Sequence, residues 1–285
     1  MRKSGEIKFV SDLTSDINAL TSDNGIVTFV GDVLGNTQNV TGNIGSSSNS
    51  INTLNVGENG TNKYSTTIID GNIYATNTIL NNGISNNSTL ELTDGSNITS
   101  TIKTSKDSQG ILAFLGDLIA TGTIGTDTEK LAQINAADTG KTVRFNSSLN
   151  ADKLNLIADG TVVLADNSNI NSSITTTINN QGTLDFEGNS TVTGEIGTSL
   201  ESLKEITLGT SGKTVNFKKD VYASNIIFES DGTVNSDGNL TTDINFSGNN
   251  ATVNISDGKG ILGSVETLAT NNTGILNFKG DGVID

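Results

Sequence analysis

The sequence predicts an all-β protein folded as a right-handed parallel β-helix, a solenoid of stacked coils of roughly 24 residues each. Three observations lead to this fold class. A set of motifs recurs at a constant offset, apolar and polar residues alternate over short runs, and the 285 residues contain no proline. Proline cannot donate to a ladder of backbone hydrogen bonds, so a chain that is paired along nearly its whole length has reason to avoid it.

An eight-residue motif is repeated along the chain. Its copies begin near residues 5, 25, 110, 182 and 274, and the clearest of them runs from Gly110 to Asp117. The offset from Gly110 to Gly182, which we call the repeat offset, also separates two copies of each of three further motifs. A fixed period of this kind is typical of repeat architectures. The earlier members of these pairs are Thr121-Gly122-Thr123-Ile124-Gly125, Gly140-Lys141-Thr142-Val143-Arg144-Phe145 and Asp159-Gly160-Thr161-Val162, and the first of these motifs has one more copy at Thr41-Gly42-Asn43-Ile44-Gly45.

Inside each repeat the apolar residues follow a period of two and the runs end at Gly, Asn or Asp. This pattern predicts short strands with one buried face, separated by turns. A unit as long as the repeat offset then divides into three coils, in which Asn and Thr at the turns can stack into hydrogen-bonded ladders. The alternating pairs are Val143/Phe145, Leu154/Leu156, Val162/Leu164, Leu184/Phe186, Ile206/Leu208, Val215/Phe217, Ile226/Phe228 and Val253/Ile255.

Phe114, Phe186 and Phe278 hold the same place in three copies of the eight-residue motif. We therefore expect all three to occupy equivalent inward sites.

Two other architectures compete with the solenoid. A propeller repeats every ~40 to 50 residues and brings Trp-Asp signatures, which this chain lacks. Antiparallel sandwiches use Asp-Gly hairpin turns, and that dipeptide recurs along the chain, among other places at 70–71, 94–95, 159–160, 231–232, 257–258 and 281–282.

Composition excludes several function classes. With no His and no Cys, the chain holds no Ser-His-Asp or Cys-His nucleophile system, no usual zinc site and no thiol chemistry. There are 31 acidic and 16 basic residues, for a net charge of -15, which argues against nucleic acid or an anionic membrane as the main partner.

The repeated motifs, together with Val221-Tyr222-Ala223-Ser224-Asn225, resemble the passenger region of large bacterial autotransporters, especially the rickettsial outer-membrane surface antigens. The resemblance covers residues 20 to 285. It implies a right-handed parallel β-helix that is exported across the outer membrane and displayed at the cell surface or released, where it adheres to host cells. Residues 4–10 offer no apolar signal segment and no barrel pattern follows Asp285, so we expect residues 1–285 to be a single repeat domain, a fragment lacking both parts.

Paired carboxylates are the one enzymatic arrangement that the composition leaves open. Asp231, Asp237 and Asp243 could share one face of a coil stack, as could Asp159 and Asp166. Most of these residues stand beside Gly or Asn in turns, so we expect structural roles for them. Polysaccharide-binding solenoids also use aromatic platforms, whereas aromatic residues make up only 4% of this chain.

The sequence gives little support for a calcium site or a phosphate site. The acidic turns do not match the calcium-binding repeats of β-rolls or the ligand density of an EF-hand. Gly-Lys-Thr at 140–142 and 212–214 lacks the remainder of a phosphate-binding loop, so we interpret it as the start of a strand, with Lys141 and Lys213 solvated at a coil corner.

We therefore expect a non-enzymatic, surface-exposed stalk or adhesion segment without catalytic, cofactor-binding or metal-binding residues. Its expected partners, by resemblance, are a host-cell surface receptor and the outer-membrane translocator barrel of the same parent chain. The alternative is a polysaccharide-binding or polysaccharide-cleaving β-helix. Three or more carboxylates and an arginine lining a groove would favour that alternative, and a smooth Thr- and Asn-covered stack would favour the stalk.

Overall fold

The computed structural model describes residues 5–58, 62–84, 86–247, 250–267 and 274–285. The chain forms a parallel β-solenoid, and no described residue lies in a helix. The predicted fold class is thereby confirmed, and the antiparallel sandwich is excluded because the strand pairs are parallel. Two compact units make up the chain. One comprises Met1–Ala136 with Leu149–Asp152, and the other Ala137–Ser148 with Lys153–Asp285.

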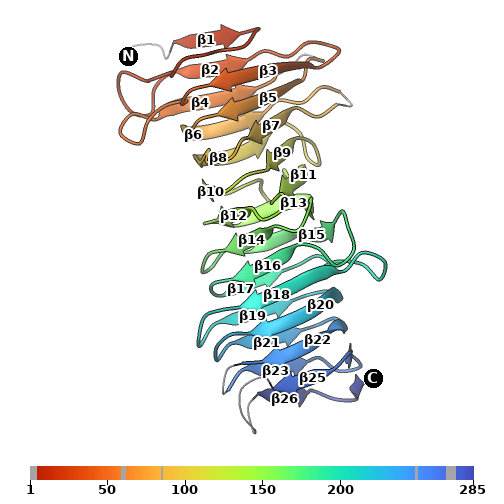
Figure 1. The fold of residues 1–285 in the computed structure, drawn as a ribbon. Coiled ribbons are helices and arrows are strands. Elements are labelled where there is room, and N and C mark those ends of the chain that lie inside the picture. The colour runs from red at the N-terminus through yellow and green to blue at the C-terminus, as the bar shows by residue number, and fades with distance from the viewer. Residues whose placement is uncertain (1–4, 59–61, 85, 248–249, 268–273) are drawn as a thin grey trace. The chain divides into compact units, whose positions relative to one another are not determined.

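Among the described residues, eleven strands lie wholly in the first unit (Figure 1). Strand β13 (Leu149–Leu156) begins in the first unit and ends in the second. The eleven are β1 (Glu6–Phe9), β2 (Ile26–Phe29), β3 (Asn36–Thr41), β4 (Ile51–Val56), β5 (Ser65–Asp70), β6 (Ile73–Leu80), β7 (Thr89–Leu92), β8 (Ile98–Thr104), β9 (Ile111–Phe114), β10 (Leu118–Thr121) and β11 (Leu131–Ala136).

The remaining strands belong to the second unit. They are β12 (Thr142–Phe145), β14 (Thr161–Leu164), β15 (Ile170–Thr176), β16 (Thr183–Phe186), β17 (Ser190–Val192), β18 (Leu203–Leu208), β19 (Thr214–Phe217), β20 (Val221–Phe228), β21 (Thr233–Ser236), β22 (Leu240–Phe246), β23 (Thr252–Ile255), β24 (Gly260–Leu262), β25 (Val265–Thr267), β26 (Ile275–Phe278) and β27 (Val283–Ile284).

Three parallel stacks build the first unit. One follows β1, β2, β4, β6 and β8, and a second follows β3, β5, β7, β9 and β11. The third is a narrow column of single bridges and strand ends, in which Ile17, Ile44, Ile73 and Ile98 pair in turn. Each coil therefore contributes one segment to each of three stacks.

The second unit repeats this arrangement. Its first stack follows β12, β14, β16, β18, β20, β22 and β25, and its second follows β17, β19, β21, β23 and β26. A third column passes through Ile174, Ile196, Val221, Leu240 and Ile261. Long strands such as β20 join the third column to the first stack across a bulge.

Consecutive coils are about 22 residues apart, slightly fewer than the sequence predicted. In the second unit, because of this difference, two copies of a motif that are one repeat offset apart lie in different stacks. Strand β12 lies in the first stack, whereas β19, which carries the later copy of its motif, lies in the second stack. The same holds for β14 and β21. The offset corresponds to three coils plus one side of a coil, so the expected division into three whole coils is wrong.

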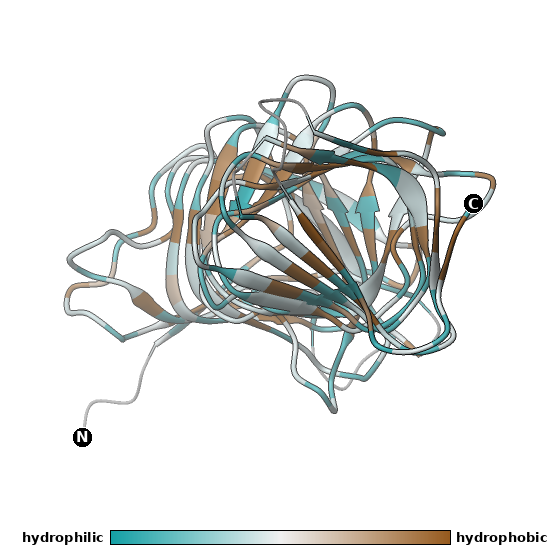
Figure 2. Ribbon diagram, turned by 90° about the horizontal axis from the view of Figure 1, so that it is seen from below, coloured by the Kyte–Doolittle hydropathy of each residue, from teal (hydrophilic) through white to brown (hydrophobic). Residues whose placement is uncertain are grey.

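Alternation along the strands decides which side chains are buried. In the second unit Val143, Phe145, Leu164, Phe186 and Phe217 are at most 1% exposed, and apolar and polar bands alternate along the strands in Figure 2. The rings of Phe186 and Phe217 reach across from different stacks, with centroids 6.0 Å apart. Burial of such aliphatic and aromatic side chains is the main favourable contribution to folding.

The equivalence expected of the three phenylalanines holds only in part. Phe114 and Phe186 are buried, at 0% and 1% exposure. Phe278 lies on β26 in the second stack of the second unit, where it is half-buried. It differs from Phe186 in stack because the motif moves by one side of a coil between copies, and in burial because β26 is the end strand of its stack among the described residues.

The Thr-Gly-x-Ile-Gly motif also has a packing explanation. Its isoleucine at 196 belongs to the third column of the second unit, and its two glycines lie where neighbouring coils touch. A Cβ atom on Gly194 would stand 2.2 Å from the carbonyl oxygen of Ser172. Gly197 has a φ of +65°, in the left-handed region that favours glycine. The motif is repeated because every corner of this kind brings two backbones into contact.

The asparagine ladder expected at the turns is present in the first unit, where the Nδ2 of Asn72 donates to the Oδ1 of Asn43 at 3.1 Å and the Nδ2 of Asn97 donates to the Oδ1 of Asn72 at 3.3 Å. A second ladder lies on strands, where the sequence did not predict one. On the outer face of the second stack of the second unit, Asn216, Asn235, Asn254 and Asn277 form one row. Each Nδ2 in the three later residues donates to the Oδ1 of the asparagine one coil earlier, at 2.8, 2.8 and 2.9 Å. Because each bond joins adjacent coils, the ladder fixes the spacing of the outward side chains along the stack.

Candidate functional site

A row of charged side chains lies on the outer face of the first stack of the second unit. The guanidinium of Arg144 on β12 donates two hydrogen bonds to the two carboxylate oxygens of Glu187, which follows β16. The two residues are partners across the intervening strand β14, which pairs with both β12 and β16. A guanidinium and a carboxylate in this bidentate arrangement form a strong, geometrically defined pair.

Asp185 and Glu205 complete this charged row. The Oγ1 of Thr207 donates to the Oδ1 of Asp185 at 2.8 Å, and Thr207 lies next to Asp185 in the register of β16 and β18. Burial raises the pKa of Asp185, and the hydrogen bond from Thr207 opposes that rise. Burial also raises the pKa of Glu205, with Lys204 acting in the opposite direction.

The Arg144–Glu187 pair shifts both partners toward their charged forms. Its hydrogen bonds lower the pKa of Glu187 and raise the pKa of Arg144, and in both cases desolvation opposes the shift. The row therefore combines a self-compensated ion pair with Asp185, a carboxyl group that keeps its proton more readily than usual. Such a group can exchange a proton with a ligand hydroxyl, and the row can accept hydrogen bonds from a polar chain lying across the coils.

The five carboxylates singled out in the sequence do not form a cluster. Each instead binds a residue one or two coils away. Asp159 pairs with Lys204 at 2.9 Å, Asp166 with Lys213 at 2.7 Å and Asp237 with Lys218 at 2.9 Å. Asp231 and Asp243 accept hydrogen bonds from the backbone nitrogens of Asn250 and Ser264, respectively.

These carboxylates hold neighbouring parts of the stack together. Their partners come from other coils, whereas the sequence suggested partners within the same turn. Lys213 was expected to be only solvated, but its Nζ is held by the carboxylate of Asp166. Both copies of Gly-Lys-Thr precede strands, β12 and β19, as interpreted from the sequence. In the part of the chain that the structure describes, no group of three or more acidic side chains could hold a metal ion.

The charged row escaped the sequence analysis even though one signal was available. Arg144 and Asp185 each stand between two inward apolar residues, so alternation places them on the outside. Arg144 is also one of only two arginines in the chain. What the sequence lacked was the strand register that brings β12 and β16 to the two sides of β14.

A second feature of the second unit is a hollow without charged residues, which we call the asparagine hollow. Its volume is about 180 Å³. It opens where the turn before β15 meets the beginnings of β17 and β19. The lining residues are Asn167, Asn169, Asn189, Ser190, Thr191, Thr214 and Asn216.

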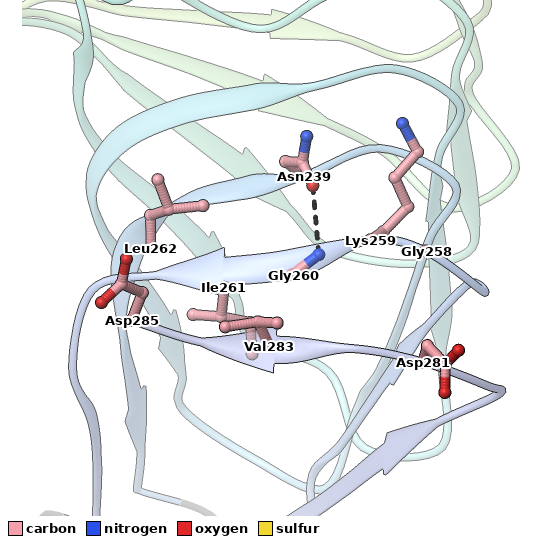
Figure 3. Close-up of a pocket in the computed structure, with 9 residues that line it drawn as sticks. All are labelled: Asn239, Gly258, Lys259, Gly260, Ile261, Leu262, Asp281, Val283 and Asp285. Carbon is pink, nitrogen blue, oxygen red and sulfur yellow. Dashed lines mark hydrogen bonds between the residues drawn. The ribbon is translucent and has the colours of Figure 1, made fainter.

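Two further hollows stand out among the described residues. One of about 260 Å³ lies along β24 and β27, where Ile261 and Val283 are flanked by Lys259 and Asp285 (Figure 3). The Oδ1 of Asn239 accepts a hydrogen bond from the backbone nitrogen of Gly260 beside it, at 3.1 Å.

The other hollow, in the first unit, has about 200 Å³ and lies beside the ion pair of Lys8 with Glu58, whose Nζ and Oε1 atoms are 2.6 Å apart. Side chains of Thr28, Asn55 and Asn81 line it as a hydrogen-bonded ladder. Like the asparagine hollow, it is a polar depression on the outer surface of a stack.

Comparison with known proteins found no matching family model, no matching curated protein and no matching solved structure. None of the described segments forms an apolar helix of the length needed to cross a membrane.

Proposed function

We propose that this chain is a non-enzymatic passenger segment of a bacterial autotransporter, which acts at the cell surface as a stalk or an adhesion surface. The observation that carries the proposal is the row of asparagines on the second stack of the second unit. Neighbouring coils present identical neutral side chains there, and hydrogen bonds of 2.8 to 2.9 Å fix them in place. A rigid, repeated polar face suits a spacer or an extended contact surface.

The charges of the second unit support the same role. Asp159, Asp166 and Asp237 are each engaged by a lysine from another coil, so these carboxylates cross-link the stack. Exposed ion pairs of this kind contribute little individually to the free energy of unfolding. Distributed along the stack, they tie coils to one another without creating a concave reactive site. Under this proposal the partners are a host-cell receptor and the translocator barrel of the parent protein.

Cell binding tests the proposal directly. The purified chain, labelled and titrated onto cultured animal cells, should bind saturably if it is an adhesin, whereas a passive stalk should show no saturable binding. In parallel it should release neither reducing ends nor unsaturated products from uronic-acid and neutral polysaccharides. Reproducible turnover of any of these polymers would refute the non-enzymatic role.

A second candidate function, polysaccharide binding or cleavage, is favoured by the charged row. One face carries an arginine and three carboxylates, namely Arg144, Asp185, Glu187 and Glu205. Burial raises the pKa values of Asp185 and Glu205. If turnover is found, Asp185→Asn should abolish it while Asp231→Asn, which changes a carboxylate bonded to a neighbouring turn, should leave it intact. Equal effects of the two substitutions would show that the charged row is not the reactive site.

A further inference from the structure

We infer that the asparagine hollow binds an uncharged saccharide unit through side-chain amide donors. The lining consists of asparagine, serine and threonine only, in a chain whose net charge is -15. The adjacent charges, Asp166 and Lys213, compensate each other at 2.7 Å. A neutral set of hydroxyl and amide groups complements the hydroxyls of a neutral sugar better than it complements a phosphate or a uronic acid, which call for basic side chains.

The donors of the hollow are oriented in advance. The Oδ1 of Asn189 accepts a hydrogen bond from the backbone nitrogen of Thr214 at 3.0 Å. The Oδ1 of Asn169 accepts one from the backbone nitrogen of Thr191 at 2.8 Å. These bonds fix both amide planes, and neither Nδ2 group has an acceptor among the described residues. Both asparagines line the hollow, so each has there an amide group that is held at its oxygen and an N–H₂ donor without a protein acceptor, and a group held beforehand loses little entropy on binding.

The size of the hollow matches a single ring. Pockets for drug-sized ligands begin near ~300 Å³, so a volume of about 180 Å³ admits one monosaccharide unit and leaves the remainder of a longer chain outside. The surface beyond the hollow continues the same chemistry, because Asn216 lines the hollow and also begins the ladder through Asn235 and Asn254. Successive coils repeat at ~4.8 Å, so an oligosaccharide leaving the hollow meets amide groups at regular steps.

Hydrogen bonds alone hold the sugar in this arrangement, because no aromatic ring lines the hollow. Exchange of water for protein partners makes each such bond weak in net terms. We therefore expect dissociation constants on the order of 1 mM for a single oligosaccharide. Several copies displayed on one surface would raise the apparent affinity by multivalency. The inference rests on the proposed adhesion function for its biological meaning, since it names the class of ligand that the surface would contact.

The test uses the whole chain and two substitutions that keep each structural acceptor while removing the donor. In Asn189→Asp and Asn169→Asp the carboxylate still accepts the bond from the backbone nitrogen, but no N–H₂ group remains. The matched control is Asn179→Asp, because the Oδ1 of Asn179 accepts a bond from the backbone nitrogen of Ser202 at 2.9 Å in a turn outside the hollow. Circular dichroism and thermal unfolding check that the three variants remain folded.

Neutral β-glucan and mannan oligosaccharides and, as the charged comparison, an oligogalacturonate are titrated by calorimetry and by backbone amide chemical shifts. We expect a neutral oligosaccharide to shift the amides of the hollow, and both hollow variants to bind at least tenfold more weakly than Asn179→Asp. Equal binding by all three variants, preference for the oligogalacturonate, or no binding of any neutral oligosaccharide would overturn the inference.

Cell binding is measured on the same variants so that the two proposals fail separately. Cell binding that persists while neutral oligosaccharides do not bind overturns the saccharide inference and leaves the adhesion function standing. Oligosaccharide binding that depends on Asn189 in a chain that does not bind cells supports the saccharide site and refutes its use in cell adhesion.

Discussion

Replacing Phe186 by alanine should open a cavity in the core of the second unit. The side chain is 1% exposed, and in the register of its stack it lies between Leu164 and Leu208 on the neighbouring strands. Its ring also approaches that of Phe217 from the second stack, with a centroid distance of 6.0 Å and an interplanar angle of 57°. The substitution removes the whole ring from a site that is enclosed by side chains of two neighbouring strands in its own stack and of one strand in another.

The expected loss in the free energy of unfolding is ~3 to 5 kcal/mol, the usual range for phenylalanine-to-alanine changes in a well-packed core. A value near the upper end is expected because the hydrogen-bonded register holds β14 and β18 at a fixed spacing, so the surrounding strands cannot close over the cavity. Phe278→Ala is the matched control. Phe278 has the same motif position but is half-buried, so its replacement should cost ~1 to 2 kcal/mol.

Urea unfolding gives the overall loss in stability, and native-state hydrogen exchange resolves it by coil. The second measurement is needed because solenoids unfold in segments rather than in one step. In Phe186→Ala, exchange should accelerate most in β14, β16 and β18. Equal losses for the two variants, or an unchanged stability of Phe186→Ala, would refute the burial and stacking argument.

Three further changes test other parts of the structure. Asn235→Ala removes two ladder bonds and strands one donor and one acceptor, so urea unfolding should show a loss of ~1 to 3 kcal/mol, and a loss near zero would mean that the ladder is not formed in solution. Because burial raises the pKa of Asp185, the folded chain holds that proton more tightly than the unfolded chain, and stability should decline as pH rises from the ordinary value of 3.8 through the raised value. Asp185→Asn should flatten this part of the pH profile, and an unaltered profile would show that the carboxyl is not buried. Gly194→Ala places a Cβ 2.2 Å from the carbonyl oxygen of Ser172 and should lower the free energy of unfolding by ~1 to 3 kcal/mol. An unchanged melting temperature would show that the two coils are farther apart at this point.

The pattern of the sequence determined the parts of the fold that depend on neighbours along the chain. A period of two places alternate side chains on opposite faces of a strand, so Val143 and Phe145 were correctly predicted as inward and Arg144 follows as outward. Repeated motifs with turn residues between them predicted stacked coils, and the Asn-rich turns predicted the ladder through Asn43, Asn72 and Asn97. Each of these inferences needs only the local chain geometry and the identity of the residues.

The tertiary structure decided which strands lie side by side. Partners in the ladder are separated by a whole coil of turns and strands. Because the length of every turn shifts the register, a small error in the coil length estimated from the sequence assigns a motif to the wrong face. Coils slightly shorter than the sequence predicted put β12 and β19 in different stacks, and Phe278 in a different setting from Phe186. The pairing of Arg144 with Glu187 and the meeting of Asn169, Asn189 and Asn216 arise in the same way. Their proximity comes from hydrogen bonds between coils, and no local pattern encodes which coil will supply the partner.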